Sequence, residues 1–346
     1  MIVTVLGGGN GAHAAVADLT LRGHEVRWWR RSAEFPNSGR LLYRDTGETV
    51  EITPALVTHD LARAVHGSDL VLAPVPAPAQ LDLLTRLSGE LDGGQAVAFT
   101  PGTMGSRLGA QLRPDVAFLE TGTLPYLARV IAPGKVSAPV HACRLPVGSY
   151  PSAGPLADAG HAAFATAYPA AVRVSSGLDA ALCNWGPIIH SPLIVHNMGA
   201  LLSGEGDFDV HAEGTSAATL AVTDALDAER IALRLGLGIA GPHWPLEDYY
   251  AGRDNSYYPP DARDRLVGSG LWREPVDLQH RYVTEDVRCG LVLNVALAHR
   301  VGVSAPVGTA IVTLLGIALG EDLLATGRTP ESIGNPESWL AVAESA

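Results

Sequence analysis

The sequence predicts an α/β domain with a doubly wound, mostly parallel sheet, followed by an all-α domain. In the first half of the chain, short apolar runs alternate with helical periodicity, which is the pattern of a parallel sheet covered by helices. After about residue 175 the strand signals fade and helical periodicity dominates. We therefore expect a first domain over residues 1–179 and a helical domain over residues 180–346.

The chain opens with an apolar strand, Ile2–Leu6, that leads directly into a glycine-rich turn with the spacing G-x-G-x-x-A. Gly7 permits a tight turn, Gly9 allows a pyrophosphate to approach the backbone, and the small Ala12 lets the next helix pack closely on the sheet. The N–H groups at the start of that helix would face the phosphates. The cofactor contacts predicted in this turn are Gly7, Gly9, Asn10, Gly11 and Ala12.

A helix over Ala14–Arg22 and a strand over Glu25–Trp29 complete the strand–turn–helix–strand order of a Rossmann domain. At the end of the second strand, NAD-binding proteins usually place an acidic residue that binds the ribose 2′-OH. This chain has Arg30, Arg31 and Ser32 instead. Two guanidiniums and a hydroxyl suit a 2′-phosphate, so the sequence favours NADP(H), with NAD(H) as the alternative cofactor. The structural alternative is a pair of solvated surface arginines.

The remaining elements are predicted from the same periodicities. In the first half we expect helices over Pro54–Val65 and Gln80–Leu91, strands over Leu70–Val75 and Ala96–Phe99, and a loop over Gly148–Gly154. In the second half we expect helices over Thr215–Leu235, Thr284–Val301 and Val307–Leu324, and an irregular insertion over Gly252–Pro275.

The composition excludes several classes of protein. A net charge of -12 argues against a nucleic-acid partner, which would require a basic surface. Cys143, Cys183 and Cys289 are far apart and are expected to be reduced core thiols, with neither a disulfide framework nor a metal site. Without a secretory signal, the cytoplasm is the expected location. The uncharged stretch Val301–Gly320 is interrupted by glycine, proline and threonine, so we expect a buried helix and no membrane span.

Hydride transfer to a C=O or C=N group needs a proton donor, and histidine titrates near neutral pH. Of the twelve histidines, His190 stands out because it lies near the start of the helical half, with His196 as a competitor. A core histidine without a catalytic role is the structural alternative for both. Glu285 and Asp286 would occupy the first turn of a helix that Thr284 could cap, and one carboxylate could orient an imidazole.

Segments spread along nearly the whole chain share motifs with one enzyme family. They are Leu6–Gly11, Asn184–Asn197, Asp227–Ala232, Arg281–Val287, Gly302–Pro306 and Gly327–Gly334. The glycine motif is generic to many dehydrogenases, whereas the Tyr-x-x-Glu-Asp-Val segment and the surroundings of His190 are much more specific. The chain resembles the NAD(P)-dependent opine dehydrogenases, the octopine/nopaline dehydrogenase family.

The resemblance implies a Rossmann domain and an all-helical domain with the active site in the cleft between them. It also implies reductive condensation of an amino acid with a 2-oxo acid, and a homodimer. In these roles His190 exchanges a proton with the carbonyl or carbinolamine oxygen, NADPH delivers hydride to the imine carbon, and Asp286 holds the imidazolium. Gly186 and Ser191 stand where the family commonly has Asn and Pro, which leaves the substrate pair open.

Two other functions stay open from the sequence. A reductase of 2-oxo acids such as ketopantoate could use the same two domains, and a non-catalytic NADP-binding sensor could keep only the first. Arg144, Arg281 and Arg328 are candidates to bind the two carboxylates of an opine, without a choice among them.

Overall fold

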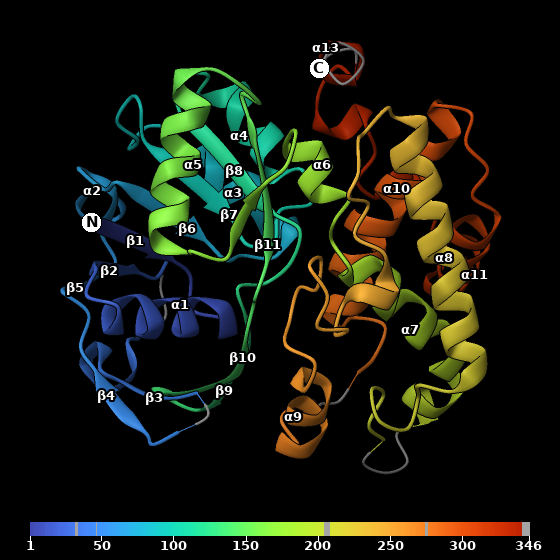
Figure 1. Cartoon of the computed structure of the whole chain (residues 1–346), viewed down its shortest axis with the longest axis horizontal. Helices are drawn as coiled ribbons and strands as arrows, with labels where there is room; N and C mark the ends of the chain where they lie inside the picture. Colours follow the sequence, from blue (N-terminus) through green and yellow to red (C-terminus); the bar gives the residue numbers. More distant parts are fainter. Residues whose placement is uncertain (32–33, 46, 204–207, 274–275, 341–346) are drawn as a thin grey trace. The chain divides into compact units, whose positions relative to one another are not determined.

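The structure is a computed structural model that describes residues 1–31, 34–45, 47–203, 208–273 and 276–340. It divides the chain into two compact units (Figure 1). The first unit contains Met1–Ala181 and Tyr250–Leu266, and the second contains Leu182–Tyr249 and Val267–Ala346. A single boundary at residue 179 therefore does not describe this division. Residues 250–266 lie in the second half of the sequence but pack with the first unit.

An eight-stranded sheet with the order β12-β11-β8-β7-β6-β1-β2-β5 forms the centre of the first unit. All neighbouring strands are parallel except β11 and β8, which confirms the predicted mostly parallel sheet. The strands are β1 (Ile2–Leu6), β2 (Glu25–Trp29), β5 (Leu56–Thr58), β6 (Leu70–Ala73), β7 (Ala96–Phe99), β8 (Ala117–Thr121), β11 (Leu145–Tyr150) and β12 (Ala171–Arg173). The strand order reverses between β1 and β6, and such a switch point is where open α/β sheets bind ligands.

Helices cover both faces of this sheet, so its strands are apolar on both sides. On β6, Leu70 and Leu72 belong to the core that includes α1 and α5, whereas Val71 and Ala73 belong to the core that includes α2 and α3. These helices are α1 (Asn10–Leu21), α2 (Leu61–Val65), α3 (Gln80–Leu87), α4 (Gly105–Leu112) and α5 (Pro155–Ala167). The alternation explains why these strands appear in the sequence as continuous apolar runs.

Two local predictions in this unit are wrong. The segment predicted as one helix over residues 54–65 contains β5, which pairs with the edge of β2, and its helix begins only after Asp60. The Asp60 side chain caps that helix by accepting from the Arg63 N–H at 3.1 Å. The loop expected from Gly148 is also partly strand, because β11 continues to Tyr150 in pairing with β8.

A second, four-stranded sheet with the order β4-β3-β10-β9 has no counterpart in the sequence prediction. Its strands are β3 (Leu41–Arg44), β4 (Val50–Ile52), β9 (Tyr126–Ala132) and β10 (Lys135–His141). It packs on α1, where the buried hydroxyl of Tyr126 donates to the Asp18 carboxylate at 2.7 Å. The first unit therefore has α1 between two sheets.

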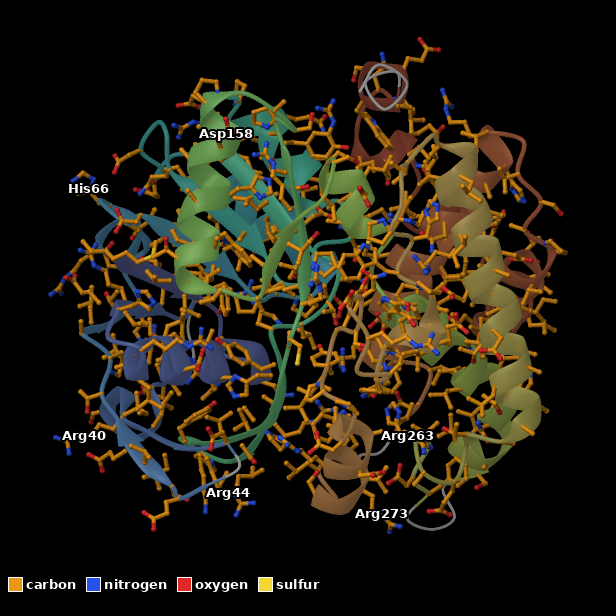
Figure 2. All side chains as sticks on the ribbon, viewed as in Figure 1. Arg40, Arg44, His66, Asp158, Arg263 and Arg273 are labelled. Carbon is orange, nitrogen blue, oxygen red and sulfur yellow. The ribbon has the colours of Figure 1, made fainter. Side chains whose placement is uncertain are left out.

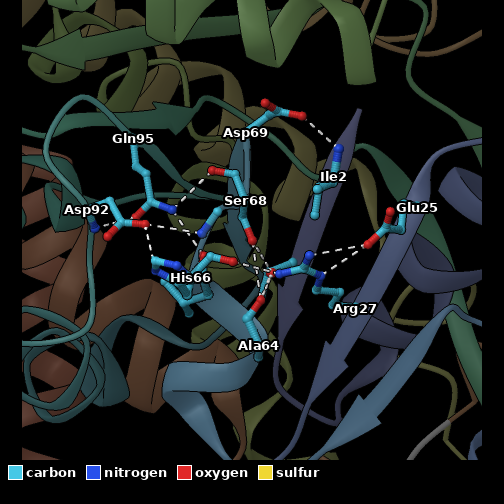
Figure 3. A network of polar contacts seen from close by, with 12 residues as sticks. Ile2, Glu25, Arg27, Ala64, His66, Ser68, Asp69, Asp92 and Gln95 are labelled. Carbon is cyan, nitrogen blue, oxygen red and sulfur yellow. Dashed lines mark hydrogen bonds and ion pairs between the residues drawn. The ribbon is translucent and has the colours of Figure 1, made fainter.

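A polar network closes the amino ends of the parallel strands (Figure 3). The Ile2 N–H donates to the Asp69 carboxylate at 2.7 Å. The Arg27 guanidinium pairs with Glu25 at 3.2 Å and donates to the His66 carbonyl at 2.7 Å. Because the chain's own groups occupy this edge, the opposite edge, where the strands end, is the place for a ligand.

Among its described residues, the second unit contains helices joined by turns and loops, and no strand. Its longer helices are α7 (Gly186–Ser203), α8 (Ala217–Gly236), η4 (Tyr282–Leu291), α10 (Val292–Arg300) and α11 (Pro306–Leu319). Buried apolar side chains of α7, α8, η4, α10 and α11 share one core. α11 is not buried all round as predicted, because Leu314 and Ile317 are 51% and 75% exposed.

Among the described residues, no single helix has both the length and the hydropathy to cross a membrane. Pro306–Leu319 and Leu323–Ile333 meet that test only as a pair, with a 92° bend between them.

Charged side chains project from the periphery of both units, as Arg44 and Asp158 do in the first and Arg273 does in the second (Figure 2). Cys183 and Cys289 are buried free thiols, as expected. Cys143 is exposed, so its predicted place in the core is wrong. It follows the end of β10, where the chain leaves the sheet.

Candidate active site

Two helices of the second unit, α7 and η4, approach each other closely through a glycine on each. A Cβ atom at Gly186 of α7 would lie 2.2 Å from the Asp286 Oδ1 atom. A Cβ atom at Gly290 of η4 would lie 2.2 Å from the Pro187 Cγ atom. Since real Cβ atoms do not come so near other heavy atoms, both positions need glycine for this packing.

The close approach brings His190 and Asp286 together, although they are far apart in the sequence. The His190 Nδ1 and Asp286 Oδ2 atoms are 2.7 Å apart, and the two side chains are only 15% and 7% exposed. Burial raises the pKa of the Asp286 carboxyl, and the positive charges of Arg281 and His280 oppose that effect. With Nδ1 engaged by the carboxylate, Nε2 is the ring nitrogen that can exchange a proton with another molecule.

The carboxylate bonded to His190 is Asp286, not its neighbour Glu285, which is also buried. Both lie in η4, a π-helix in which the Val292 N–H donates to the carbonyl five residues back. Thr284 does not cap this helix as expected, because the helix begins at Tyr282. The Thr284 hydroxyl instead donates to the His280 carbonyl at 3.3 Å.

Sequence reasoning missed two aromatic side chains beside the dyad. The Tyr282 ring stacks on the His190 imidazole, with centroids 3.6 Å apart and planes at 13°. The Tyr282 hydroxyl lies 2.7 Å from the His211 Nε2 atom. Tyr282 stands inside the motif that includes Asp286, whereas His211 had no local signal. The competing candidate His196 is exposed on α7.

The two departures from the family pattern have local partners in the structure. The Gly186 N–H donates to the Asn184 Oδ1 atom at 3.0 Å. The Ser191 hydroxyl donates to the Pro187 carbonyl at 2.6 Å, one helical turn back.

No group of three or more His, Cys, Asp and Glu side chains suited to a metal ion occurs among the described residues.

In the first unit, the glycine turn has the geometry that a dinucleotide requires. Gly7 has a φ of +121°, which side chains other than glycine rarely adopt, and a Cβ atom at Gly9 would meet nothing within 4 Å. No side chain caps α1, which begins after Gly9. The backbone beside the start of α1 is thus open to a pyrophosphate, and a dinucleotide fits there.

The predicted cofactor residues after Gly9 fall into two groups. Ala12 is fully buried, and a Cβ atom at Gly11 would come within 3.2 Å of the Pro74 Cβ atom, so both positions serve close packing of α1. The Asn10 side chain accepts from the Val130 N–H at 2.8 Å, which ties α1 to β9. Asn10 therefore has a structural contact, and its backbone N–H at the helix start remains the group aimed at a phosphate.

The arginines after β2 differ in their surroundings. Arg30 lies over the turn, since a Cβ atom at Gly8 would be 2.8 Å from the Arg30 Nε atom. That Nε atom is buried and has no hydrogen-bond partner among the described residues, and burial lowers the pKa of the guanidinium. Arg31 is exposed and pairs with Asp82 at 3.2 Å. Ser32 lies outside the described residues.

Comparison with known proteins agrees with this fold. Residues 173–319 match the family model described as NAD/NADP octopine/nopaline dehydrogenase, alpha-helical domain. The opine dehydrogenase of Arthrobacter sp. (strain 1C) is 28% identical over 348 residues, which cover 95% of this chain and 94% of that protein.

Solved structures share the fold. Octopine dehydrogenase with NADH and L-arginine has a TM-score of 0.71 at 19% identity, covering 96% of each chain. Yersinopine dehydrogenase with bound NADP+ has a TM-score of 0.64 at 15% identity, covering 100% of this chain and 98% of that one.

Together, these findings define an NAD(P)-dependent oxidoreductase acting on CH–NH groups. Residues 173–319 match the helical domain of that family, and the similarity to the curated opine dehydrogenase extends over nearly the whole chain, as expected for an opine-type dehydrogenase.

Proposed function

We propose that this protein uses NADP(H) to condense an amino acid reductively with a 2-oxo acid. The observation that carries the proposal is the buried His190–Asp286 pair, with its 2.7 Å contact, in a chain whose first unit has a dinucleotide turn. When bound, the nicotinamide supplies the hydride. The second unit supplies the proton.

His190 has one proton transfer to perform in this reaction. Attack of the amine on the 2-oxo acid gives a carbinolamine, which loses water to form an imine, and the departing oxygen must be protonated. The His190 Nε2 atom donates that proton. Asp286 orients the imidazole through Nδ1 and stabilises its charged form.

The substrate is expected to carry carboxylates, for which an arginine is the suitable partner. Among the three arginines considered from the sequence, Arg281 is the one whose charge lowers the pKa of Asp286, and its guanidinium lies 5.0 Å from the Tyr282 ring centroid. We therefore assign Arg281 to a substrate carboxylate. Arg328 instead affects the pKa of Cys289, and Arg144 belongs to the first unit.

The preference for NADP(H) is supported by Arg30. Its guanidinium is partly removed from water, and its Cζ atom lies 5.6 Å from the Trp28 ring centroid. Its Nη1 atom donates to the Glu34 carbonyl at 2.6 Å, and no carboxylate pairs with it among the described residues. A cation in that position is stabilised by an anion, and a 2′-phosphate has the charge and geometry to provide one. A homodimer and a cytoplasmic location stay predictions from the sequence.

The test is the initial rate of NADPH oxidation with a grid of 2-oxo acids, each with and without a panel of amino acids, and with NADH in parallel. We expect turnover only when both substrates are present, and faster turnover with NADPH. Turnover with the oxo acid alone would instead identify a carbonyl reductase. NADPH binding without any turnover would favour a sensor.

A further inference from the structure

The imidazole of His190 is held by two different contacts from the same π-helix. Asp286 binds the ring edge at Nδ1, and Tyr282 covers a ring face at a centroid distance of 3.6 Å. The edge contact alone allows the ring to tilt about the hydrogen bond, whereas the stack fixes its plane. The two contacts together set the direction in which Nε2 points.

Tyr282 is itself fixed. The residue is fully buried, and its hydroxyl is 2.7 Å from the His211 Nε2 atom. The backbone of His211 is held in a turn, where its N–H donates to the Asp209 carboxylate at 3.0 Å and its carbonyl accepts from the Thr215 hydroxyl at 2.6 Å. A continuous set of contacts therefore leads from this turn to the dyad.

We propose that Tyr282 and His211 are positioning residues for proton transfer by His190. Tyr282 sets the plane of the imidazole, and His211 holds the phenol ring in place through its contact with the hydroxyl. This inference rests on the proposed function for its kinetic consequence. A small misdirection of Nε2 slows proton transfer while leaving the groups that bind substrate in place, so the effect belongs in kcat and not in KM.

Two substitutions at Tyr282 separate the stack from the hydrogen bond. Tyr282→Phe keeps the aromatic ring and removes the bond to His211, so we expect kcat to fall roughly 2- to 10-fold, with His211→Gln giving a similar loss. Tyr282→Leu removes the stack as well, and we expect a loss of about 100-fold. KM for both substrates should stay near its wild-type value in Tyr282→Phe and in His211→Gln, which keep the aromatic ring beside Arg281.

The decisive measurement repeats Tyr282→Leu in a His190→Ala background. If Tyr282 acts through His190, the added substitution leaves the residual kcat unchanged, because there is no imidazole left to position. Tyr168→Phe, which removes a buried hydroxyl hydrogen-bonded to Tyr126 in the first unit, is the matched control and should retain full kcat. Thermal unfolding of each variant verifies that it folds.

A second readout does not depend on turnover. In the wild type, the Hε1 proton of His190, assigned by its loss in His190→Ala, should be displaced upfield by the Tyr282 ring current. Tyr282→Leu should abolish that displacement, and Tyr282→Phe should largely keep it.

The inference is overturned if Tyr282→Leu keeps wild-type kcat, if it lowers kcat equally in the His190→Ala background, or if the Hε1 resonance does not respond. If the wild type turns over no substrate pair, the proposed function fails. The resonance then decides the positioning by itself.

Discussion

The Asp286 Oδ1 atom occupies the space that any side chain at Gly186 would need, 2.2 Å from the Cβ position. The absence of a side chain at Gly186 is therefore what allows α7 and η4 to approach closely enough for the 2.7 Å contact between His190 and Asp286. Gly186 contributes no functional group of its own. It provides the space in which the carboxylate lies.

Gly186→Ala should therefore displace Asp286 and reduce kcat by about 10- to 100-fold, because misplacing a catalytic group by about 1 Å has an effect of that order. The matched control is Gly199→Ala in the same helix, where a Cβ atom would meet nothing within 4 Å. Steady-state kinetics of both variants with the same substrates provide the comparison. Equal kcat in the two variants would contradict the prediction.

Asp286→Asn should lower kcat by about 10²- to 10⁴-fold, because the amide cannot stabilise an imidazolium and can favour the wrong tautomer of His190. The alkaline limb of the reductive pH profile should also move to lower pH, since the charged imidazole loses its partner. Glu285→Gln removes the adjacent buried carboxylate and should lower kcat much less than Asp286→Asn does. A comparable loss in both variants would show that general negative charge, and not the bond to His190, is responsible.

Arg30→Gln should raise the KM for NADPH about 10- to 100-fold and change the KM for NADH little, as expected for loss of a charged hydrogen bond to a phosphate. Arg31→Gln should have a smaller effect, because Arg31 already pairs with Asp82. Arg40→Gln makes the same change of charge at an exposed arginine facing Glu51 and serves as the control. If Arg30→Gln raises the KM for NADPH and the KM for NADH equally, Arg30 does not contact the 2′-phosphate.

His161 should make the stability of the protein depend on pH. Burial lowers its pKa from 6.5 to about 4, and its Nε2 atom lies 3.1 Å from the Ser149 hydroxyl. The unfolded chain therefore binds a proton at a higher pH than the folded one, so the free energy of unfolding is highest above pH 6.5 and falls as the pH decreases towards 4. The largest decrease in the free energy of unfolding that this shift of the His161 pKa can produce is about 3 kcal/mol.

Urea unfolding across that pH range measures this loss. His161→Gln should flatten the dependence, whereas His66→Gln, at a histidine whose side chain is 82% exposed, should leave it intact. If the urea concentration at the wild-type unfolding midpoint does not decrease as the pH is lowered from 6.5 to 4, the effect of His161 is excluded.

The core of the fold could be predicted because its signals are local. The strands at Ile2–Leu6, Glu25–Trp29 and Ala96–Phe99 were found at their observed bounds, since each is a short apolar run next to a turn. β5 was mistaken for helix because its pairing with β2 is a tertiary contact. The four-stranded sheet was missed because its alternating strands carry weak signals and are stabilised by packing on α1.

The candidate site was predictable to a similar degree. The sequence indicates His190 and the Glu285–Asp286 pair as candidates, the resemblance pairs His190 with Asp286, and the structure brings these two together. The roles of Gly186, Tyr282 and His211 could not be derived from the sequence, because each depends on how α7, η4 and the turn at His211 pack. The choice of Asp286 over Glu285 likewise depends on the pitch of a π-helix.

The segment Tyr250–Leu266 has a consequence for dissecting the enzyme. Its Tyr257 and Tyr258 side chains are fully buried in the first unit, and the Tyr257 carbonyl accepts from the Cys143 N–H at 2.7 Å. A fragment that stops at Ala181 would lack both aromatic rings and expose the surface they cover. The nucleotide-binding unit is therefore encoded discontinuously, and an expression fragment would need residues 250–266 spliced onto its carboxyl end.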